Sequence, residues 1–362
     1  MAGELTAVAM SGGVDSSVAA ALLAREGRPL VGFSMYLARR HEGGGGGEKA
    51  RCCSLDDCQD ARQVARSFGF PHHVLDMEED FRRLVLDPFK ADYARGRTPS
   101  PCVGCNTFLK FGALVGKARE VGASTVATGH YARLERDARS GRTLLRRAAD
   151  EGKDQSYFLF DLSEEQRRAA EFPLGRMTKD EVREAARSLG LRVADKPESM
   201  DLCFLSRGES YRDFLERGGI AEASEPGEIV DVEGRALARH EGIAGFTVGQ
   251  RRGLGVAAGR PLYVVRIDEE SRRVVVGGSE DLLSDRCTIE RVRWIPFDRP
   301  VGPVRATVKI RSTHSGAKAT LDDLGDGTAV VRFDEPQRAV APGQAAVAYD
   351  GDLVLGGGWI RT

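Results

Sequence analysis

The sequence predicts an α/β fold in which an N-terminal doubly wound parallel sheet is followed by a mostly β C-terminal part. Two observations carry this prediction. Up to about residue 205, short apolar runs alternate with segments of helical periodicity. Beyond that point, β-branched runs separated by glycine replace the helical spacing, as in RPLYVVRIDEESRRVVVGG and GTAVVRFDEP. A further break near residue 279 divides the β-rich part into a small linker domain and a barrel or sandwich.

The N-terminal elements follow from the spacing of apolar residues. LTAVAM is a short apolar strand that ends at a glycine turn. DSSVAAALLAREG carries Val18, Leu22 and Leu23 at helical spacing, and Gly27 ends the helix. In chain order the sequence predicts strand 5–10, helix 15–27, strand 29–37, helix 58–69, strand 71–77, helix 108–122 and strand 124–134.

Composition limits the classes of function. The 53 Lys and Arg residues against 54 Asp and Glu give a net charge of -1, which excludes a uniformly basic nucleic-acid binder but leaves local basic patches. The N-terminus lacks the pattern of a secretory signal, and no stretch approaches the ~20 apolar residues that span a bilayer. We therefore expect a cytoplasmic protein with no membrane partner. Its seven cysteines are then expected to be catalytic, metal-binding or buried.

The stretch SGGVDSS at 11–17 lies where the first strand meets the first helix, and it predicts a phosphate-binding loop. Gly12 and Gly13 let the backbone approach an anion, while the hydroxyls of Ser11, Ser16 and Ser17 can donate hydrogen bonds. The loop lacks the lysine of Walker-type loops. It resembles the pyrophosphate-binding loop of the ATP pyrophosphatase (PP-loop) superfamily, whose members split ATP into AMP and pyrophosphate.

Two cysteine motifs lie far apart in the chain, TPSPCVGCNTFLKF at 98–111 and SMDLCF at 199–204. The C-x-x-C spacing by itself is compatible with a zinc half-site, a dithiol redox pair, a pair of iron–sulfur ligands or a nucleophile with a neighbour. Together with SGGVDSS and further motifs, in order from residue 9 to residue 351, they resemble the tRNA 2-thiouridylase family. The further motifs are TGHYAR at 128–133, KDQSYFL at 153–159, FTVGQRRGLG at 246–255 and APGQAAV at 341–347.

This resemblance implies the fold, the reaction and the partners. It implies a PP-loop catalytic domain, adenine nucleotide alpha hydrolase-like, over residues 1–205, a linker domain over 206–278 and a tRNA-contacting β-barrel over 279–362. Members of the family adenylate the C2 oxygen of the wobble uridine of tRNA and replace it with sulfur, giving 2-thiouridine. ATP, Mg²⁺, a tRNA with a wobble uridine, and a persulfide donor such as a cysteine desulfurase or sulfur-relay protein are therefore expected.

The resemblance also implies roles for the cysteines. Cys203 matches the persulfide carrier, and Cys105 matches the nucleophile that pairs with it in a transient disulfide. We expect Cys105 at the start of a helix, where the pKa of a thiol is lowered. Cys102 stands where the family has Asp or Cys, so it is a candidate third thiolate, and the three cysteines are candidate ligands of a four-iron, four-sulfur cluster. The sequence does not decide between cluster and persulfide, although we favour the persulfide. No fourth ligand for zinc is evident.

Other site residues follow motif by motif. Asp15 is expected to orient Mg²⁺ or to cap the first helix, and Met35 to contact adenine or to lie in the core. One departure is KIRSTHSG, where Ser312 and Thr313 replace an aromatic or basic residue that is common in the family. The resemblance implies ATP binding by Ala9, Met10, Ser11, Gly12, Gly13, Val14, Asp15, Ser16, Met35 and Gly129. It implies tRNA binding by Ser100, Pro101, Cys102, His130, Lys153, Asp154, Gln155, Arg311, Ser312 and Gln344.

Some assignments stay open at this stage. The chain could be another PP-loop adenylating ligase, which needs an ammonia or amino-acid site, or a non-catalytic RNA-binding protein with a degenerate nucleotide site. The sequence identifies neither the substrate tRNAs, nor the sulfur donor, nor the oligomeric state. Cys52, Cys53 and Cys58 are expected to be structural, and Cys287 to lie in the barrel core. An arginine-rich hairpin is a candidate RNA contact, and it contains Arg133, Arg136, Arg139, Arg142, Arg146 and Arg147.

Overall fold

The computed structural model describes residues 4–37, 55–197, 202–205, 208, 211–217, 225–256 and 258–361. The chain forms two compact units. The first contains residues 1–85, 102–209 and 352–354, and the second contains 86–101, 210–351 and 355–362. The predicted domain limits at 205/206 and 278/279 stay predictions. No helix in the described ranges has the length and apolar character needed to cross a membrane.

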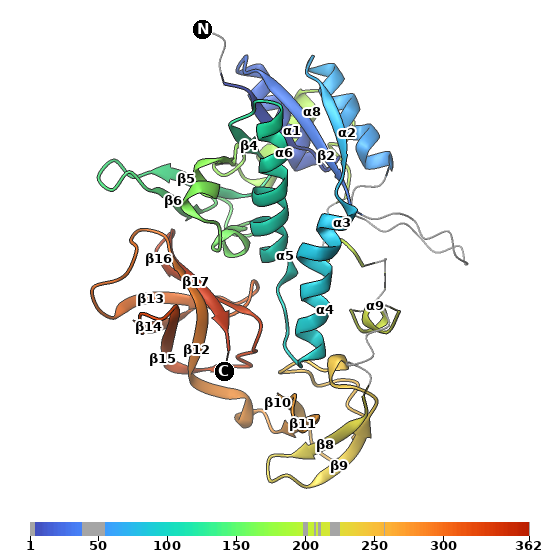
Figure 1. The fold of residues 1–362 in the computed structure, drawn as a ribbon, viewed down its shortest axis with the longest axis vertical. Helices are drawn as coiled ribbons and strands as arrows, with labels where there is room; N and C mark the ends of the chain where they lie inside the picture. The colour runs from blue at the N-terminus through green and yellow to red at the C-terminus, as the bar shows by residue number, and fades with distance from the viewer. Residues whose placement is uncertain are drawn as a thin grey trace. The chain divides into compact units, whose positions relative to one another are not determined.

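A parallel sheet forms the centre of the first unit, with strand order β3-β2-β1-β4-β7. Figure 1 labels β2 and β4 of this sheet. Each neighbouring pair is parallel, and the residues of β1 and β2 are almost all buried, as expected for strands covered on both faces. This confirms the doubly wound sheet. The strands are β1 (Thr6–Ala9), β2 (Leu30–Tyr36), β3 (His72–Asp76), β4 (Thr125–Ala127) and β7 (Ala170–Glu171).

Helices alternate with these strands, and the predicted helices 15–27 and 58–69 are found as α1 and α2. Apolar side chains of α1 and α2 form one core cluster with residues of β1 and α8. Helices α7 and α8 each begin with a capping box, built by Ser163 with Gln166 and by Thr178 with Glu181. The helices of this unit are α1 (Val14–Arg25), α2 (Leu55–Ser67), α3 (Glu78–Phe81), η1 (Arg82–Leu86), α5 (Pro101–Gly104), η2 (Cys105–Ala113), α6 (Leu114–Glu120), η3 (Ser156–Leu159), α7 (Glu164–Arg168) and α8 (Lys179–Ser188).

The predicted single strand 124–134 is wrong, because the chain leaves the parallel sheet after β4. Residues 128–131 turn away, and the next strand, β5 (Ala132–Arg136), pairs antiparallel with β6 (Thr143–Arg147) as the predicted arginine-rich hairpin. A Cβ at Gly129 would lie 2.6 Å from the backbone nitrogen of Ser16, so the chain leaves the sheet at the point where it packs closely against α1. Apolar periodicity does not record such a contact, which explains the error.

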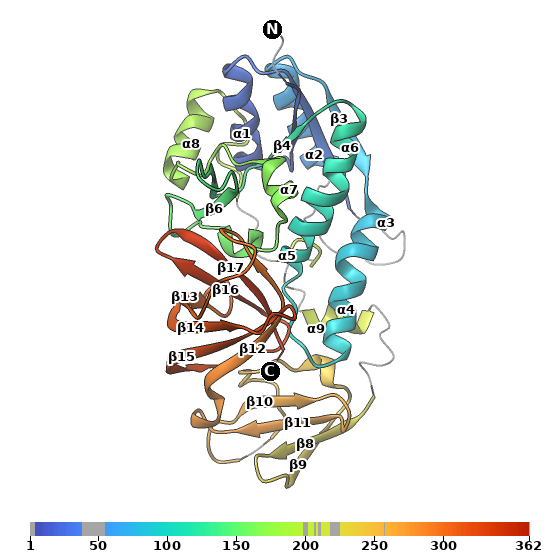
Figure 2. The same ribbon diagram turned by 60° about the vertical axis from the view of Figure 1, so that its left-hand side comes forward.

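A small β-sheet forms the linker part of the second unit, with strand order β10-β11-β8-β9 (Figure 2). Its buried face includes Ile229, Val264 and Val274. The ring of Tyr93 on α4 stacks on Tyr211 of α9, with centroids 4.9 Å apart. The elements are α4 (Asp87–Ala94), α9 (Tyr211–Arg217), β8 (Gly227–Asp231), β9 (Ala236–His240), η5 (Ile243–Gly245), β10 (Tyr263–Asp268) and β11 (Arg273–Gly277).

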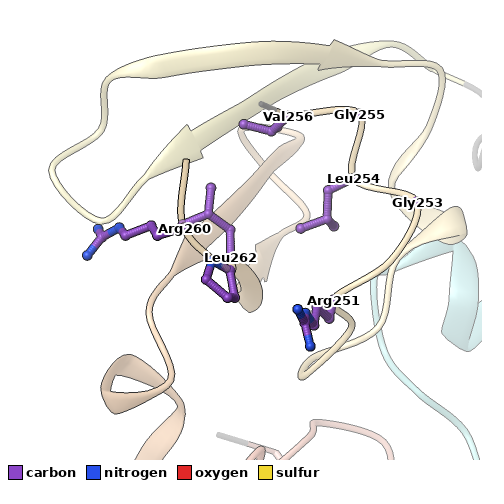
Figure 3. Close-up of a pocket in the computed structure, with 8 residues that line it drawn as sticks. Arg251, Gly253, Leu254, Gly255, Val256, Arg260 and Leu262 are labelled. Atoms are coloured by element: carbon purple, nitrogen blue, oxygen red, sulfur yellow. The ribbon is translucent and has the colours of Figure 1, made fainter. Parts of the chain in front are cut away.

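A pocket of about 420 Å³ opens in this linker part, within the segment that includes FTVGQRRGLG. Leu254 and Leu262 provide apolar lining, and Figure 3 draws Arg251 and Arg260 on different sides of it. Because the two guanidinium groups do not converge, the pocket does not form a ready site for a single anion.

The C-terminal strands close into a barrel, so the alternative of a sandwich is wrong. The order is β12-β15-β14-β13-β16-β17, and β12 also pairs with β17, which closes the sheet. Cys287 on β12 is buried, as predicted for a barrel core residue. The elements are η6 (Glu280–Leu282), β12 (Leu283–Trp294), β13 (Val304–Lys309), β14 (Ala317–Asp323), β15 (Thr328–Arg338), β16 (Ala345–Asp350) and β17 (Leu353–Ile360).

Candidate active site

The glycine loop between β1 and α1 has the geometry of an anion-binding site. Gly12 has φ +72°, and a Cβ there would lie 2.2 Å from the carbonyl oxygen of Asp57, so only glycine fits. Gly13 is the N-cap residue of α1, and no side chain forms a capping hydrogen bond there. A Cβ at Gly13 would meet only the Ser11 hydroxyl, at 3.5 Å. The first turn of α1 therefore offers backbone N–H groups to an anion, beside a position that glycine leaves open.

The three loop serines differ in their surroundings. The Ser16 hydroxyl accepts a hydrogen bond from the backbone N–H of Ser11 at 3.1 Å and lies 3.2 Å from the Ser11 hydroxyl. These two side chains shape the loop. Ser17 is fully buried, and within the described residues its hydroxyl has no hydrogen-bond partner. The expectation that Ser17 donates to a phosphate is not supported, because its side chain does not reach the surface of the loop.

Asp15 is held by a nearly buried lysine. Its carboxylate accepts hydrogen bonds from the Tyr131 hydroxyl at 2.7 Å and from Lys179 Nζ at 2.7 and 2.9 Å. Since Gly13 occupies the N-cap, the expected capping role of Asp15 is wrong. In the described part of the chain, no group of three or more His, Cys, Asp or Glu side chains is placed to hold a metal ion. Mg²⁺ normally binds proteins through one or two carboxylates together with substrate phosphates, so Asp15 fits Mg²⁺ only when a nucleotide is bound.

The remaining expected ATP-binding residues lie at the carboxyl edge of three neighbouring strands. The glycine loop follows β1, Met35 lies near the end of β2, and Gly129 follows β4. This edge is where ligands bind to open α/β sheets. Gly129 approaches the loop as expected, while the side chain of Met35 is buried.

Sequence reasoning missed Lys196. Its Nζ donates hydrogen bonds to the Gly12 carbonyl at 2.9 Å, to Asp57 at 2.6 Å and to Asp60 at 2.7 Å. Burial opposes the charge, but hydrogen bonds to these two carboxylates and their negative charge raise the pKa of Lys196. Lys196 thus fastens the glycine loop to α2. No local pattern in the sequence links these segments, although DKPES directly precedes a cysteine motif.

The cysteine helix differs from the prediction. α5, η2 and α6 follow one another without a break from Pro101 to Glu120, so the helix begins before Cys102 and Cys105 is not at its start (Figure 1). Burial raises the pKa of the Cys105 thiol, Lys110 opposes this rise and Cys203 adds to it. The expected lowering of the Cys105 pKa is therefore wrong for this state of the protein.

Cys102, Cys105 and Cys203 come together in the first unit as thiols. The Cys102 side chain is exposed to solvent, but many protein atoms surround its sulfur. This desolvation is the main cause that raises the pKa of Cys102, and the nearby Cys105 and Cys203 raise it further. Within the described ranges these thiols do not form a group of three or more side chains placed to hold a metal ion. The iron–sulfur cluster stays a prediction from the resemblance. Cys58 is buried in α2, whereas Cys52 and Cys53 lie outside the described residues.

His130 is buried and hydrogen-bonded on both sides of its ring. Nδ1 lies 2.7 Å from the Thr128 hydroxyl, and Nε2 lies 3.3 Å from Lys110 Nζ. Burial, and then the charge of Lys110, hold the pKa of His130 well below its ordinary value. An ammonium group can only donate, so Nε2 is the acceptor and the neutral ring carries its proton on Nδ1. In this structure His130 is 8% exposed, which leaves little surface for the expected tRNA contact.

Several of the other expected tRNA-binding residues form hydrogen bonds or ion pairs within the protein. Asp154 accepts from the backbone N–H of Ala148 at 3.1 Å, and Gln155 accepts from that of Tyr131 at 2.9 Å. Lys153 is half-buried. In the hairpin, Arg133 and Arg146 both pair with Asp352 at 2.6 Å, which weakens the expected RNA-binding patch.

The expected tRNA residues of the second unit are also partly engaged. Gln344 donates to the carbonyl oxygens of Thr98 at 2.9 Å and Pro99 at 3.3 Å, so it supports the segment that leads to Ser100 and Pro101. Arg311 donates to a backbone carbonyl at 3.3 Å. Ser312 is half-buried.

Comparisons with known proteins cover almost the whole chain. Three family models match, described as tRNA methyl transferase HUP domain over residues 4–207, tRNA methyl transferase PRC-barrel domain over 212–278 and aminomethyltransferase beta-barrel domain over 284–360. Proteins named tRNA-specific 2-thiouridylase MnmA are similar over their full length. The one from Koribacter versatilis is 49% identical, covering 99% of both chains. Those from Solibacter usitatus and Geobacter metallireducens are 51% and 50% identical, covering 98% of this chain and 98% and 95% of theirs.

Proposed function

Because this chain belongs to the tRNA-specific 2-thiouridylase family, we propose that it replaces the C2 oxygen of the wobble uridine of tRNA with sulfur at the expense of ATP. The observation that carries the proposal is one compact unit holding both an open glycine loop and three neighbouring thiols. The family models have descriptions that mention methyl transfer. The full-length relatives support thiolation instead, and thiols in the same unit as a phosphate-binding loop supply a route for sulfur.

In the first half-reaction the uridine oxygen is activated. The first turn of α1 binds the phosphates of ATP, with Gly13 leaving the space for them. The C2 oxygen attacks the α-phosphorus, the bond to the β-phosphate oxygen breaks, and pyrophosphate leaves. Mg²⁺ bound with the nucleotide would neutralise phosphate charge, and Asp15 is the carboxylate that would hold it. The oxygen is now part of a good leaving group, AMP.

In the second half-reaction Cys203 and Cys105 act in turn. Cys203 carries a persulfide, whose terminal sulfur attacks C2 while AMP leaves with the oxygen. The Cys105 thiolate then attacks Cys203 Sγ, which forms the Cys105–Cys203 disulfide and breaks the bond to the transferred sulfur. The base leaves as 2-thiouridine. A dithiol reductant restores both thiols, and a persulfide donor reloads Cys203.

The test uses purified protein, ATP labelled at the α-phosphate, and unmodified tRNA. We expect AMP and pyrophosphate, formed faster with tRNA, and 2-thiouridine in nuclease digests once a persulfide donor is added. ADP as the product would contradict the adenylation step. ATP turnover at a rate that does not change when tRNA is added would favour another PP-loop ligase. Binding of tRNA without ATP turnover would favour a non-catalytic RNA-binding protein.

A further inference from the structure

Two adjoining pockets lie in the linker part of the second unit, and the proposed reaction uses neither of them. The first, of about 420 Å³, has Arg251 and Arg260 in its lining (Figure 3). The second, of about 490 Å³, has Tyr93 and Tyr211 in its lining. Gly253 lines both pockets. Pockets of this size commonly hold small organic groups, so the pair offers a charged compartment beside an aromatic one.

The arginines of the first pocket differ from others in the linker part, because they have no carboxylate partner. Arg235 and Arg273 pair with carboxylates at 2.6 and 3.4 Å. Arg251 and Arg260 are exposed, and neither side chain forms an ion pair within the described ranges. Among the described residues that line the two pockets there is no Asp or Glu. The pockets therefore present positive charge that suits an anionic ligand.

The segment that carries Arg251 has a fixed shape. The side-chain oxygen of Gln250 accepts a hydrogen bond from the backbone N–H of Thr247 at 3.0 Å, and its Nε2 donates to the carbonyl of Arg252 at 2.9 Å. Leu254 packs into the apolar core of the linker sheet. The backbone on both sides of Arg251 is thus held before any ligand arrives, so binding does not have to order this loop first.

The second pocket offers an aromatic ring that is already held in place. Tyr93 is buried, and its ring stacks on Tyr211 with centroids 4.9 Å apart and planes inclined by 17°. Tyr211 itself stays partly exposed. Its hydroxyl lies 3.3 Å from the Thr247 hydroxyl, so polar groups lie beside the ring. A nucleobase combines a flat apolar face with a hydrogen-bonding edge, and aromatic side chains bind such faces with little regard to sequence.

We propose that these two pockets bind one unstacked nucleotide of single-stranded RNA, with its base on Tyr211 and its flanking phosphates at Arg251 and Arg260. The two guanidinium groups lie on different sides of their pocket, which disfavours a single anion. The same arrangement suits a strand, in which each nucleoside lies between two phosphates. An unpaired base can stack on a side chain, whereas a base inside a helix is covered by its neighbours. This inference rests on the proposed function for the choice of RNA as the ligand.

The test measures RNA binding by the full-length protein without ATP or a sulfur donor. The probe is a fluorescein-labelled strand of seven uridines, and its anisotropy gives the affinity at several salt concentrations. Arg251→Gln and Arg260→Gln should each weaken binding and lower the slope of log affinity against log salt by roughly 0.7, the value for one phosphate contact on a single strand. Arg235→Gln is the matched control, since Arg235 is exposed and pairs with Asp231, and it should change neither quantity.

Variants of Tyr211 test the site of the base. Tyr211→Phe should bind the strand as the wild type does, because the aromatic face remains. Tyr211→Leu should weaken binding roughly tenfold with an unchanged salt slope, because stacking contributes affinity without charge. Leucine keeps an apolar side chain against Tyr93, and thermal unfolding checks that this variant is folded.

Three outcomes would overturn the inference. One is equal affinity of the wild type and the double variant with Arg251→Gln and Arg260→Gln. Another is a loss of binding in that double variant with no effect of Tyr211→Leu, because a basic surface alone would then explain the binding. The third is displacement of the strand by AMP that Tyr211→Leu abolishes, which would assign the pockets to a free nucleotide. Failure of the wild-type protein to form AMP from ATP would instead contradict the proposed function and leave the binding result valid.

Discussion

At the scale of single residues, the two loop glycines have different reasons for being glycine. The fold requires glycine at position 12, because the backbone there is left-handed and the carbonyl of Asp57 fills the space that a Cβ would occupy. Gly13 has an ordinary φ of -89° and open space beside it, so the fold tolerates a side chain there. The absence of a side chain at Gly13 lets an anion approach the start of α1.

Gly13→Ala should therefore remove ATP turnover while the protein stays folded and binds tRNA. Gly13→Ser should lose ATP turnover in the same way, although serine is a better N-cap residue and should stabilise α1. A loss of turnover in this variant therefore cannot come from a loss of stability. Gly12→Ala should instead lower the free energy of unfolding by at least ~1–2 kcal/mol, because a left-handed conformation is costly for alanine. Urea unfolding and AMP formation measure the two effects. Normal turnover in Gly13→Ala would show that the loop does not hold the phosphates.

At the scale of elements, Lys196 is the link between the glycine loop and α2. It donates to the Gly12 carbonyl and neutralises Asp57 and Asp60. Without it, the negative charge of two carboxylates beside the loop would lose the ammonium group that neutralises it, and this charge repels phosphate groups.

Lys196→Gln should therefore weaken ATP binding about tenfold, the size of effect expected for the loss of one positive charge near the phosphates. Lys196→Arg should bind nearly as the wild type does. Adding Asp57→Asn to Lys196→Gln should recover part of the loss, since it removes one of the repelling charges. Equilibrium dialysis with labelled ATP measures all three variants. Equal affinity of Lys196→Gln and wild type would limit Lys196 to a structural role.

At the scale of the whole molecule, the first unit combines segments that are far apart in the chain. The glycine loop comes from its first segment, while Cys102, Cys105 and Cys203 come from residues 102–209. In the proposed function the two half-reactions use different parts of one unit, so we expect substitutions to separate them.

Cys203→Ser and Cys105→Ser should each keep tRNA-stimulated AMP formation and lose 2-thiouridine. Cys105→Ser should in addition prevent the disulfide with Cys203, which non-reducing peptide mapping detects. Cys102→Asp should keep much of the activity in iron-free protein, because the resemblance implies that either Asp or Cys serves at this position. Activity that rises in proportion to bound iron would contradict the persulfide route and favour a cluster.

The sequence by itself determined the doubly wound sheet, the glycine loop, the β-rich C-terminal part and the cysteines worth testing, because apolar periodicity and short motifs are local properties. It did not determine the break between β4 and β5, where Gly129 meets α1, nor the start of the cysteine helix at Pro101. Tertiary structure alone decided the partners of the charged groups. Asp15 pairs with Lys179, Gly12 with Lys196 and His130 with Lys110, over separations of 164, 184 and 20 residues. Such contacts depend on how distant segments pack, and the pKa of Cys105 depends on burial, so neither can be read from spacing along the chain.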